Sequence, residues 1–341
     1  MAVTQTDLGK AFEYACVVAL YLRYKDVQEI EIEDSPQMHT AKIKYETADN
    51  KQKDLADAAN AAVRIIERLE PRLCYPGKDT PLILAVQTDA QGIAGDVRDV
   101  LCIRRKNKWQ IGLSCKHNHH AVKHSRLSGT IDFGKEWFGI PCSRTYFTEV
   151  VPIFEQLRKM RDESKNAGRP MLWNELPNKF TDYYVPILRS FMKELKKLND
   201  ENTDIPTRLI HYLIGRYDFY KVITDDAHRT TRIEAINIAG TLNKNSGIYK
   251  PVTDIPVLKL PTAFYHIDFK PDSQNTIIVV CNNGWEISMR LHNASSRIEP
   301  SLKFDVQLIS LPGSIHAQVE PWDMIQYPIN FSDKVLKVAE K

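Results

Sequence analysis

The sequence predicts an α/β protein with a β-rich C-terminal part, and three observations support this fold class. Segments with the apolar spacing of amphipathic helices occupy residues 8–24 and 54–69. Short apolar runs typical of strands lie at 82–87, 100–104 and 109–115. From about residue 230 the pattern changes to alternating segments typical of strands, at 233–238, 264–269, 276–281, 285–291 and 303–309. We therefore expect a core with helical elaboration over residues 1–200, a helical connector over 201–224 and a β-rich part over 225–341.

The first helix has a plausible start and a clear apolar stripe. Thr6 or Asp7 can cap it, and Glu13 lies at the edge of the stripe. The stripe consists of Phe12, Cys16, Val17, Leu20 and Tyr21. Residues 27–47 alternate polar and apolar side chains, which predicts a hairpin or short strands. The alanine-rich segment 54–69 is strongly helical and ends near Pro71, and the run at 82–87 predicts a buried strand.

The next two strands concentrate the polar chemistry of the chain. Residues 100–104 and 109–115 flank a short polar turn and predict a hairpin. Alternation places Ser114 and Lys116 on one face of the second strand, opposite the face of Cys115. In such a hairpin Asp99 begins the first strand close to the end of the second. A carboxylate, a lysine and a hydroxyl would then share one site, which suits phosphodiester hydrolysis.

The residues around this hairpin are strongly basic. Only one acidic residue, Asp99, falls between the first and last of these eight cations: Arg98, Arg104, Arg105, Lys106, Lys108, Lys116, Lys123 and Arg126. Four histidines lie in the same stretch. Such density indicates a surface that faces phosphate groups. The alternative is a surface hairpin whose charges are simply solvated.

The remaining elements follow from pattern alone. The polar run after Lys116 predicts a helix, and residues 129–143 predict a loop that packs Trp137 and Phe138 on the core or enters a DNA groove. Helices are expected at 145–166, 179–198 and 206–222. Asn283 and Gly284 indicate a hairpin turn. In the strand after this turn, alternation turns Trp285, Ile287, Met289 and Leu291 to one face and Glu286, Ser288, Arg290 and His292 to the other.

Composition limits the class of protein. At 341 residues the chain can form one large or two modest domains, with 43% hydrophobic and 26% charged residues. The net charge of +3 is too small to indicate a nucleic-acid binder by itself. The six cysteines have no Cys-x-x-Cys spacing, and no apolar run approaches the roughly 18 residues of a membrane span. We expect a cytoplasmic protein with reduced thiols and no membrane association.

The motifs resemble a known enzyme family. An aspartate entering one strand and a lysine ending the next resemble the PD-(D/E)xK nuclease motif. The strings GDVRDV, SCKHNHHAVKHSRLS, WEISMRLHNASS and SLKFDVQL are similar to the HaeIII-type type II restriction endonucleases, and the resemblance extends from Gly9 to about residue 312. It implies a PD-(D/E)xK nuclease core, in which a mixed central sheet is flanked by helices. One departure is Ser114, which stands where the motif has an acidic residue.

The resemblance implies Mg²⁺-dependent cleavage of double-stranded DNA at GGCC, with blunt ends. Its implied catalytic residues are Asp99, Lys116, Ser114 and Glu13, and its implied metal-site residues are Asp99, Asp96 and Cys115. Asp96 or Glu13 would supply the carboxylate that Ser114 lacks, although Glu13 is equally consistent with a solvated helix face. Implied DNA contacts are His117, Asn118, His120, Lys123, His124, Arg126, Arg290, His292 and Asn293. The alternative for Arg290 is a salt bridge to Glu286 or Glu299.

Two other functions remain open at this point. Ser114 allows a DNA-binding protein with a degenerate nuclease site, and the basic cluster allows a repair nuclease that recognises DNA structure rather than sequence. A restriction enzyme would have a DNA methyltransferase of the same specificity as its counterpart. The sequence leaves open whether the protein is a homodimer.

Overall fold

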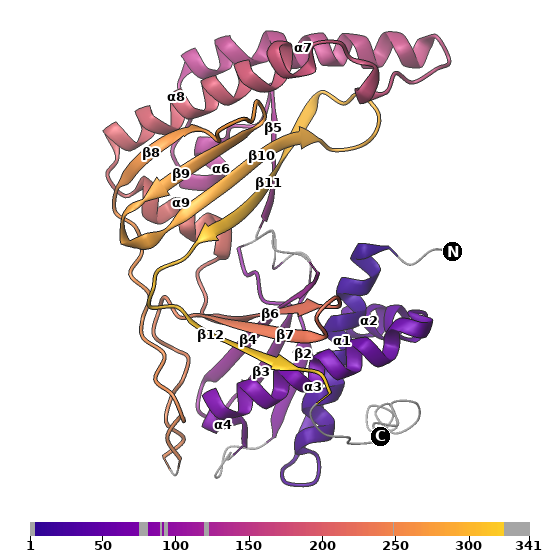
Figure 1. Cartoon of the computed structure of the whole chain (residues 1–341), viewed down its shortest axis with the longest axis vertical. Coiled ribbons are helices and arrows are strands. Elements are labelled where there is room, and N and C mark those ends of the chain that lie inside the picture. The colour runs from indigo at the N-terminus through magenta and orange to yellow at the C-terminus, as the bar shows by residue number, and fades with distance from the viewer. Residues whose placement is uncertain are drawn as a thin grey trace. The chain divides into compact units, whose positions relative to one another are not determined.

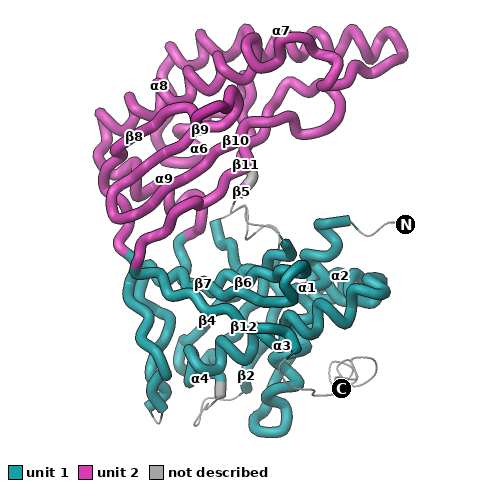
Figure 2. Tube along the Cα trace, in the orientation of Figure 1, with its two compact units in different colours: residues 1–120, 216–258, 314–341 teal, residues 121–215, 259–313 magenta. Residues whose placement is uncertain are grey.

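The computed structural model describes residues 4–74, 81–88, 91, 95–118, 123–247 and 249–323. The chain divides into two compact units (Figures 1 and 2). Unit 1 contains residues 1–120, 216–258 and 314–341, and unit 2 contains residues 121–215 and 259–313. The divisions that the sequence suggested at residues 200 and 225 do not coincide with these boundaries. Strands and helices that are far apart in the sequence join the same unit.

Unit 1 is built on a mixed sheet. Among the described residues it has seven strands in the order β1-β2-β3-β4-β6-β7-β12. Their bounds are β1 Ile30–Ile32, β2 Leu82–Val86, β3 Val100–Arg104, β4 Trp109–His117, β6 Phe219–Asp225, β7 Thr230–Ile236 and β12 His316–Pro321. β1 with β2 and β4 with β6 are parallel pairs, and the other neighbours are antiparallel. The predicted hairpin of β3 and β4 is therefore confirmed.

Helices cover one face of this sheet. Their bounds are α1 Gln5–Tyr24, α2 Pro36–Glu46, α3 Gln52–Leu69 and α4 Pro71–Cys74. α1 packs on β2 and β4, and α3 packs on β7 and β12 (Figure 1). Trp109, Ile111, Leu113 and Cys115 of β4 join the apolar core under these helices. Because side chains alternate along a strand, Ser114 and Lys116 lie on the opposite face.

Unit 2 is an antiparallel sheet with helices. The strand order is β5-β11-β10-β9-β8. The bounds are β5 Lys123–Ser128, α6 Phe133–Phe138, α7 Arg144–Asn166, α8 Val185–Glu201, α9 Ile205–Ile214, β8 Phe264–Phe269, β9 Thr276–Cys281, β10 Glu286–Asn293 and β11 Ser301–Ser310. Phe133 of α6 contacts Phe191 of α8, whose ring packs on Phe304 of β11. The helices therefore bury one face of the sheet and leave the Arg290 face outside this core.

The sequence-based elements are confirmed in most places and wrong in a few. The C-terminal strands, the helices at 54–69, 145–166 and 179–198, and the turn at Asn283 and Gly284 are confirmed. Residues 36–46 form a helix instead of a strand, because Ser35 caps it and Pro36 begins it. The chain after Lys116 continues as strand through His117 and includes the separate strand β5, instead of the expected helix.

Three further boundaries differ from the sequence-based expectation. Thr4 caps the first helix, and Asp7 closes the capping box three residues later. The third predicted helix ends at Ile214, because Gly215 with φ 82° leaves the helical conformation, and β6 follows. Residues 129–143 contain the short helix α6, whose Trp137 is buried, as expected for packing on the core. In the part of the chain that the structure describes, no helix has both the length and the apolar character needed to cross a bilayer.

Candidate active site

The structure brings Asp99 and Lys116 together at one edge of the unit 1 sheet. One carboxylate oxygen, Asp99 Oδ2, accepts hydrogen bonds from the backbone N–H of Cys115 (2.7 Å), from Lys116 Nζ (3.2 Å) and from Ser114 Oγ (3.4 Å). β3 and β4 pair antiparallel, and the N–H of Asp99 donates to Leu113 O. This pairing holds Asp99 beside residues 114–116 at the end of β4. Asp99, Ser114 and Lys116 therefore lie together, as the alternation of β4 predicted.

Glu13 on α1 adds a second carboxylate to this cluster. Its side chain is buried, and Glu13 Oε2 lies 3.4 Å from Lys10 Nζ. Burial, and after it the negative charge of Asp99, raise the pKa of Glu13 to about 8, against the opposing effects of Lys10 and Lys116. Asp99 and Lys116 both act electrostatically on Glu13, and α1 packs against β4, so Glu13 lies in the same region of unit 1. Two adjacent carboxylates of this kind form a site that a cation would stabilise.

Lys116 keeps its proton at neutral pH. Burial by itself lowers the pKa of the Lys116 ammonium. The charge and the hydrogen bond of Asp99, together with the smaller effects of Cys115 and Glu13, oppose burial, and the pKa lies above its usual value. Lys116 therefore stands in the site as a cation. This state suits the stabilisation of negative charge on a phosphate better than the removal of a proton from water.

Asp96 is engaged elsewhere. Its two oxygens accept bonds from Arg98 Nε (2.7 Å) and Arg98 Nη2 (2.6 Å), and Gln87 Nε2 donates at 2.6 Å. Both Asp96 and Arg98 are buried. Arg98 in turn lies across the face of β4, where a Cβ added to Gly112 would meet Arg98 Cδ at 2.1 Å. The predicted metal role of Asp96 has less support than that of Glu13, because a paired buried carboxylate is compensated already.

The thiol of Cys115 points away from the site. Its Sγ lies 3.8 Å from Cys16 Sγ in the apolar core. The contact with Cys16 and burial raise the pKa of the Cys115 thiol well above its usual value. Only the backbone of Cys115 reaches Asp99. The prediction of Cys115 as a metal-site residue therefore finds no support in its side chain.

The residues present fit a divalent cation with oxygen ligands. Asp99 and Glu13 offer carboxylate oxygens, which Mg²⁺ prefers. In the described residues no group of three or more His, Cys, Asp and Glu side chains converges on one point. A small dication that keeps several waters needs only one or two carboxylates, so the pair is sufficient. Ser114, which bonds to Asp99, is compatible with this arrangement.

Two residues of the site were not predicted. In the register of the sheet, Ser114 of β4 lies opposite Lys221 of β6, which lies opposite Glu234 of β7. Lys221 Nζ is 4.0 Å from Glu234 Oε2, and both residues are buried. Burial lowers the pKa of Lys221, and the positive charge of Lys116 lowers it further, against the effect of Glu234. A lysine inside the apolar strand 219–225 was a signal, but the helix predicted over 206–222 concealed it.

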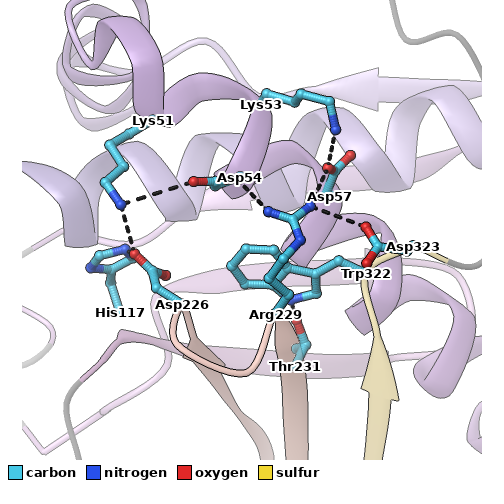
Figure 3. Close-up of polar contacts among 10 residues, drawn as sticks. All are labelled: Lys51, Lys53, Asp54, Asp57, His117, Asp226, Arg229, Thr231, Trp322 and Asp323. Atoms are coloured by element: carbon cyan, nitrogen blue, oxygen red, sulfur yellow. Dashed lines mark hydrogen bonds and ion pairs between the residues drawn. The ribbon is translucent and has the colours of Figure 1, made fainter.

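His117 and Asn118 anchor the end of β4 within unit 1. His117 is buried, with Nε2 3.4 Å from Asp226 Oδ1, and Asp226 Oδ2 bonds to Lys51 Nζ at 3.0 Å. Figure 3 shows these side chains beside a second group in which Arg229 joins Asp54, Asp57 and Asp323. Asn118 accepts a bond from Asp226 N and donates from its own N–H to Thr224 Oγ1. These contacts favour an anchoring role over the predicted contact with DNA.

Lys123 and Arg126, two other predicted DNA contacts of the basic segment, belong to unit 2. Lys123 Nζ donates to Tyr212 O (2.8 Å) and lies 3.8 Å from the centre of the Tyr212 ring, so it points to α9. Arg126 is exposed and donates to Ser301 Oγ. His120 and the side chain of His124 lie outside the described residues. Of this group, Arg126 is the cation best placed to meet a ligand.

The C-terminal candidates lie on the uncovered face of the unit 2 sheet. Arg290 is exposed, and its Nη2 is 3.3 Å from Asp305 Oδ2 on the neighbouring strand. This partner differs from both carboxylates considered from the sequence. His292 Nδ1 contacts Asn293 O at 2.7 Å, and Asn293 Nδ2 donates to Ser295 O. Register places Lys303 opposite both His292 and Arg126, so these cations share one face with Arg290.

Comparison with known proteins identifies the family. The family model described as HaeIII restriction endonuclease matches residues 9–312. The chain belongs to the HaeIII restriction endonuclease family. It is 41% identical over 325 residues to the Type II restriction enzyme HaeIII of Haemophilus aegyptius, a match that covers 95% of this chain and 100% of that protein. No solved structure matches the chain.

The match to the HaeIII restriction endonuclease family extends through both units. It begins within α1, includes the strands that carry Asp99 and Lys116, and ends just after β11. β12, the last strand of the unit 1 sheet, lies beyond the matched residues. The predicted resemblance is confirmed for the family as a whole, and the roles of single residues remain predictions.

Proposed function

We propose that this protein is a type II restriction endonuclease with a PD-(D/E)xK-type site that cuts double-stranded DNA with the help of Mg²⁺. One observation carries the proposal. The Asp99 carboxylate, held by the Cys115 N–H and the Lys116 ammonium, lies next to the buried acid Glu13. This is the donor and acceptor set that metal-assisted hydrolysis of a phosphodiester requires.

Each residue of the cluster has a distinct task. Asp99 and Glu13 would hold Mg²⁺, which when bound supplies positive charge against the phosphate oxygens. Lys116 orients the attacking water and offsets the charge that develops on the phosphorane. Lys221, held by Glu234, adds a second positive charge beside Lys116. The backbone N–H of Cys115 fixes the orientation of the Asp99 carboxylate.

The relative named above and the sequence motifs support a more specific proposal. The recognition site is GGCC, the cut is blunt, and the enzyme works in the reducing cytoplasm, where the buried thiols of Cys16 and Cys115 stay free. A DNA methyltransferase acting on the same site would protect the host DNA. Cleavage of both strands at a twofold-symmetric site suits a homodimer.

A plasmid digest tests the proposal directly. Incubation with Mg²⁺ is expected to give discrete fragments whose ends fall at GGCC, whereas EDTA abolishes cutting. Nicks or a smear without sequence preference would favour a structure-specific nuclease. DNA binding without cutting in any divalent metal would favour a degenerate site.

Glu13→Gln is expected to abolish metal-dependent cleavage and to stabilise the metal-free protein at alkaline pH. Because the pKa of Glu13 is raised to about 8 by burial, the folded protein holds a proton that the unfolded chain releases at lower pH. The free energy of unfolding therefore falls between about pH 5 and pH 8, and the glutamine variant lacks this fall. At pH 8.5 in EDTA we expect the variant to be more stable by roughly 4–5 kcal/mol.

Urea unfolding across pH, with and without Mg²⁺, measures both effects. Mg²⁺ should raise the stability of the wild type at pH 8.5 and leave the Glu13→Gln variant unchanged, since binding to the folded state alone stabilises it. Glu29→Gln, the same substitution at an exposed position, controls for the change in net charge. Wild-type cleavage by Glu13→Gln would remove Glu13 from the site.

Arg290→Ala is expected to weaken specific binding by roughly 1–3 kcal/mol and to leave non-specific binding nearly unchanged, because a forked guanidinium can bond guanine O6 and N7 together. Binding constants for a GGCC duplex and a scrambled duplex, measured over a salt series, test this. Equal losses on both duplexes would indicate a phosphate contact. No loss on either would mean that Arg290 only pairs with Asp305.

A further inference from the structure

A second basic site lies in unit 1, at the other end of the strands that form the candidate active site. A pocket of about 430 Å³ opens where the parallel strands β4 and β6 begin. Its charged lining consists of Arg72, Arg98, Lys108, Arg216, Lys244 and Asp218. Five cations and one carboxylate therefore surround a space large enough for a phosphate group and part of its sugar.

Four of these five cations have no carboxylate within ion-pair distance in the described part of the chain, although the charges of Arg72 and Lys244 act on the buried Glu70. Within the described residues, Arg72, Lys108, Arg216 and Lys244 form no ion pair, and Arg72 Nε donates only to the carbonyl of Asn245. The single carboxylate, Asp218, is fully engaged by the loop that follows β7. It accepts bonds of 2.6–2.8 Å from the backbone N–H groups of residues 238, 239 and 241 and from the hydroxyl of residue 241. An anion entering the pocket meets cations and no free acid.

Two aromatic side chains complete the pocket. The ring of Tyr217 is 48% exposed, and the Arg98 guanidinium lies 4.2 Å from its centre. Trp109 is buried, and its Nε1–H has no acceptor in the part of the chain that the structure describes. The exposed ring of Tyr217 is therefore the aromatic surface that a ligand in the pocket would meet.

The pocket opens on the same face of the sheet as the candidate active site. Gln110, which lines the pocket, shares the face of Ser114 and Lys116 by alternation along β4. The four to six residues between them span roughly 13–20 Å at about 3.3 Å per residue. Duplex DNA advances about 3.4 Å per nucleotide along each strand, so this distance corresponds to about four to six nucleotides.

We propose that this pocket binds a phosphate of the DNA that flanks the cleaved site. The inference rests on the proposed function, because it needs DNA with its scissile phosphate at Lys116. When these cations neutralise a phosphate, counterions condensed on the DNA are released, so the contact adds affinity that does not depend on sequence. A free nucleotide offers the same phosphate group. The experiment below distinguishes binding of a free nucleotide from binding of flanking DNA.

The test compares two double variants. Each changes one lysine in the turn before β4 and one lysine in the loop after β7. Lys108→Gln with Lys244→Gln removes two pocket cations. The control, Lys106→Gln with Lys250→Gln, removes exposed lysines of the same two loops that do not line the pocket. Binding constants in Ca²⁺ are measured for GGCC duplexes with flanks of about 2 and about 8 base pairs, over a salt series.

We expect the long flanks to tighten binding by the wild type and by the control pair. The pocket pair should lose about tenfold on the long duplex, with a salt slope lower by about 1–2, and should bind the short duplex as the wild type does. An unchanged gain from the flanks in the pocket pair overturns the inference, as does an equal loss in the control pair. If dAMP causes a thermal shift that only the pocket pair loses, and the pocket pair still gains affinity from the long flanks, then the pocket binds free nucleotides. This result also overturns the inference.

Failure of the wild type to bind GGCC in either duplex overturns the proposed function itself.

Discussion

Lys116→Ala is expected to lower the rate of DNA cleavage by at least about 10³-fold while specific binding stays within a few-fold of the wild type. The reason is the position of the ammonium, 3.2 Å from Asp99 Oδ2, with a pKa that burial lowers and Asp99 raises to above its usual value. A fixed positive charge at this point acts on the phosphorane more than on the ground state. Single-turnover cleavage in Mg²⁺ and gel shifts in Ca²⁺ separate the two effects.

Lys221→Met is the informative comparison for this variant. Lys221 is the second lysine of the site, is buried and pairs with Glu234, so its loss should slow cleavage by a smaller factor, about 10- to 100-fold. Both variants are checked for wild-type unfolding midpoints. Undiminished cutting by Lys116→Ala would remove Lys116 from the active site and with it the main support for the proposed mechanism.

Asp96→Ala is expected to destabilise the protein by about 3–5 kcal/mol, because it leaves the buried Arg98 guanidinium without its partner. Denaturant unfolding measures this change. Loss of cleavage in the single variant would then be ambiguous, since an unfolded enzyme and an enzyme without a metal ligand are both inactive.

The double variant Asp96→Ala with Arg98→Met resolves the ambiguity. Methionine keeps the packing of Arg98 over Gly112 and removes the buried charge, so most of the stability should return. Because Arg98 also lines the basic pocket, cleavage is measured on the duplex with short flanks. A stable double variant that cuts assigns Asp96 a positioning role. A stable double variant that fails to cut, while still binding GGCC, would make Asp96 a ligand of the metal.

The sequence predicted those parts of the fold in which local pattern and tertiary environment agree. β3 and β4 alternate because one face packs under α1, so the hairpin and the facing of Ser114 and Lys116 follow from the residues alone. The same holds for β10, whose Ile287 and Met289 are buried and whose Arg290 is exposed. In both cases the alternation of apolar and polar residues matched the alternation of buried and exposed side chains.

The sequence-based prediction was wrong where an apolar pattern suggested the wrong element and a capping residue or glycine at its boundary was overlooked. Residues 41–46 alternate like a strand, yet in α2 only Met38, Ala41 and Tyr45 are buried, which is the spacing of a helix. Gly215 ended α9 and allowed β6 to begin, although the apolar pattern continued across it. Both errors came from weighting periodicity above capping and glycine signals.

The part of the candidate active site that comes from neighbouring strands in the sequence could be predicted. Asp99, Ser114 and Lys116 are joined by a hairpin, whereas the pairing of Asp96 with Arg98 depends on how one arginine side chain crosses Gly112. Lys221 and Glu234 reach the site through strand order, because β6 pairs in parallel with β4. No local pattern encodes a partner a hundred residues away.

The interleaved units have a consequence for synthesis on the ribosome. The chain passes between the units at residues 120/121, 215/216, 258/259 and 313/314, so all of residues 121–215 is made before β6 exists. Until then β4, which carries Lys116, is an unpaired edge of the sheet, and its partner strand β6 is synthesised late. A polypeptide that stops before residue 219 has no β6 and no β7, and so lacks Lys221 and Glu234. For a protein that cuts DNA, this order means that an interrupted translation product lacks the strands that complete the sheet beside Lys116.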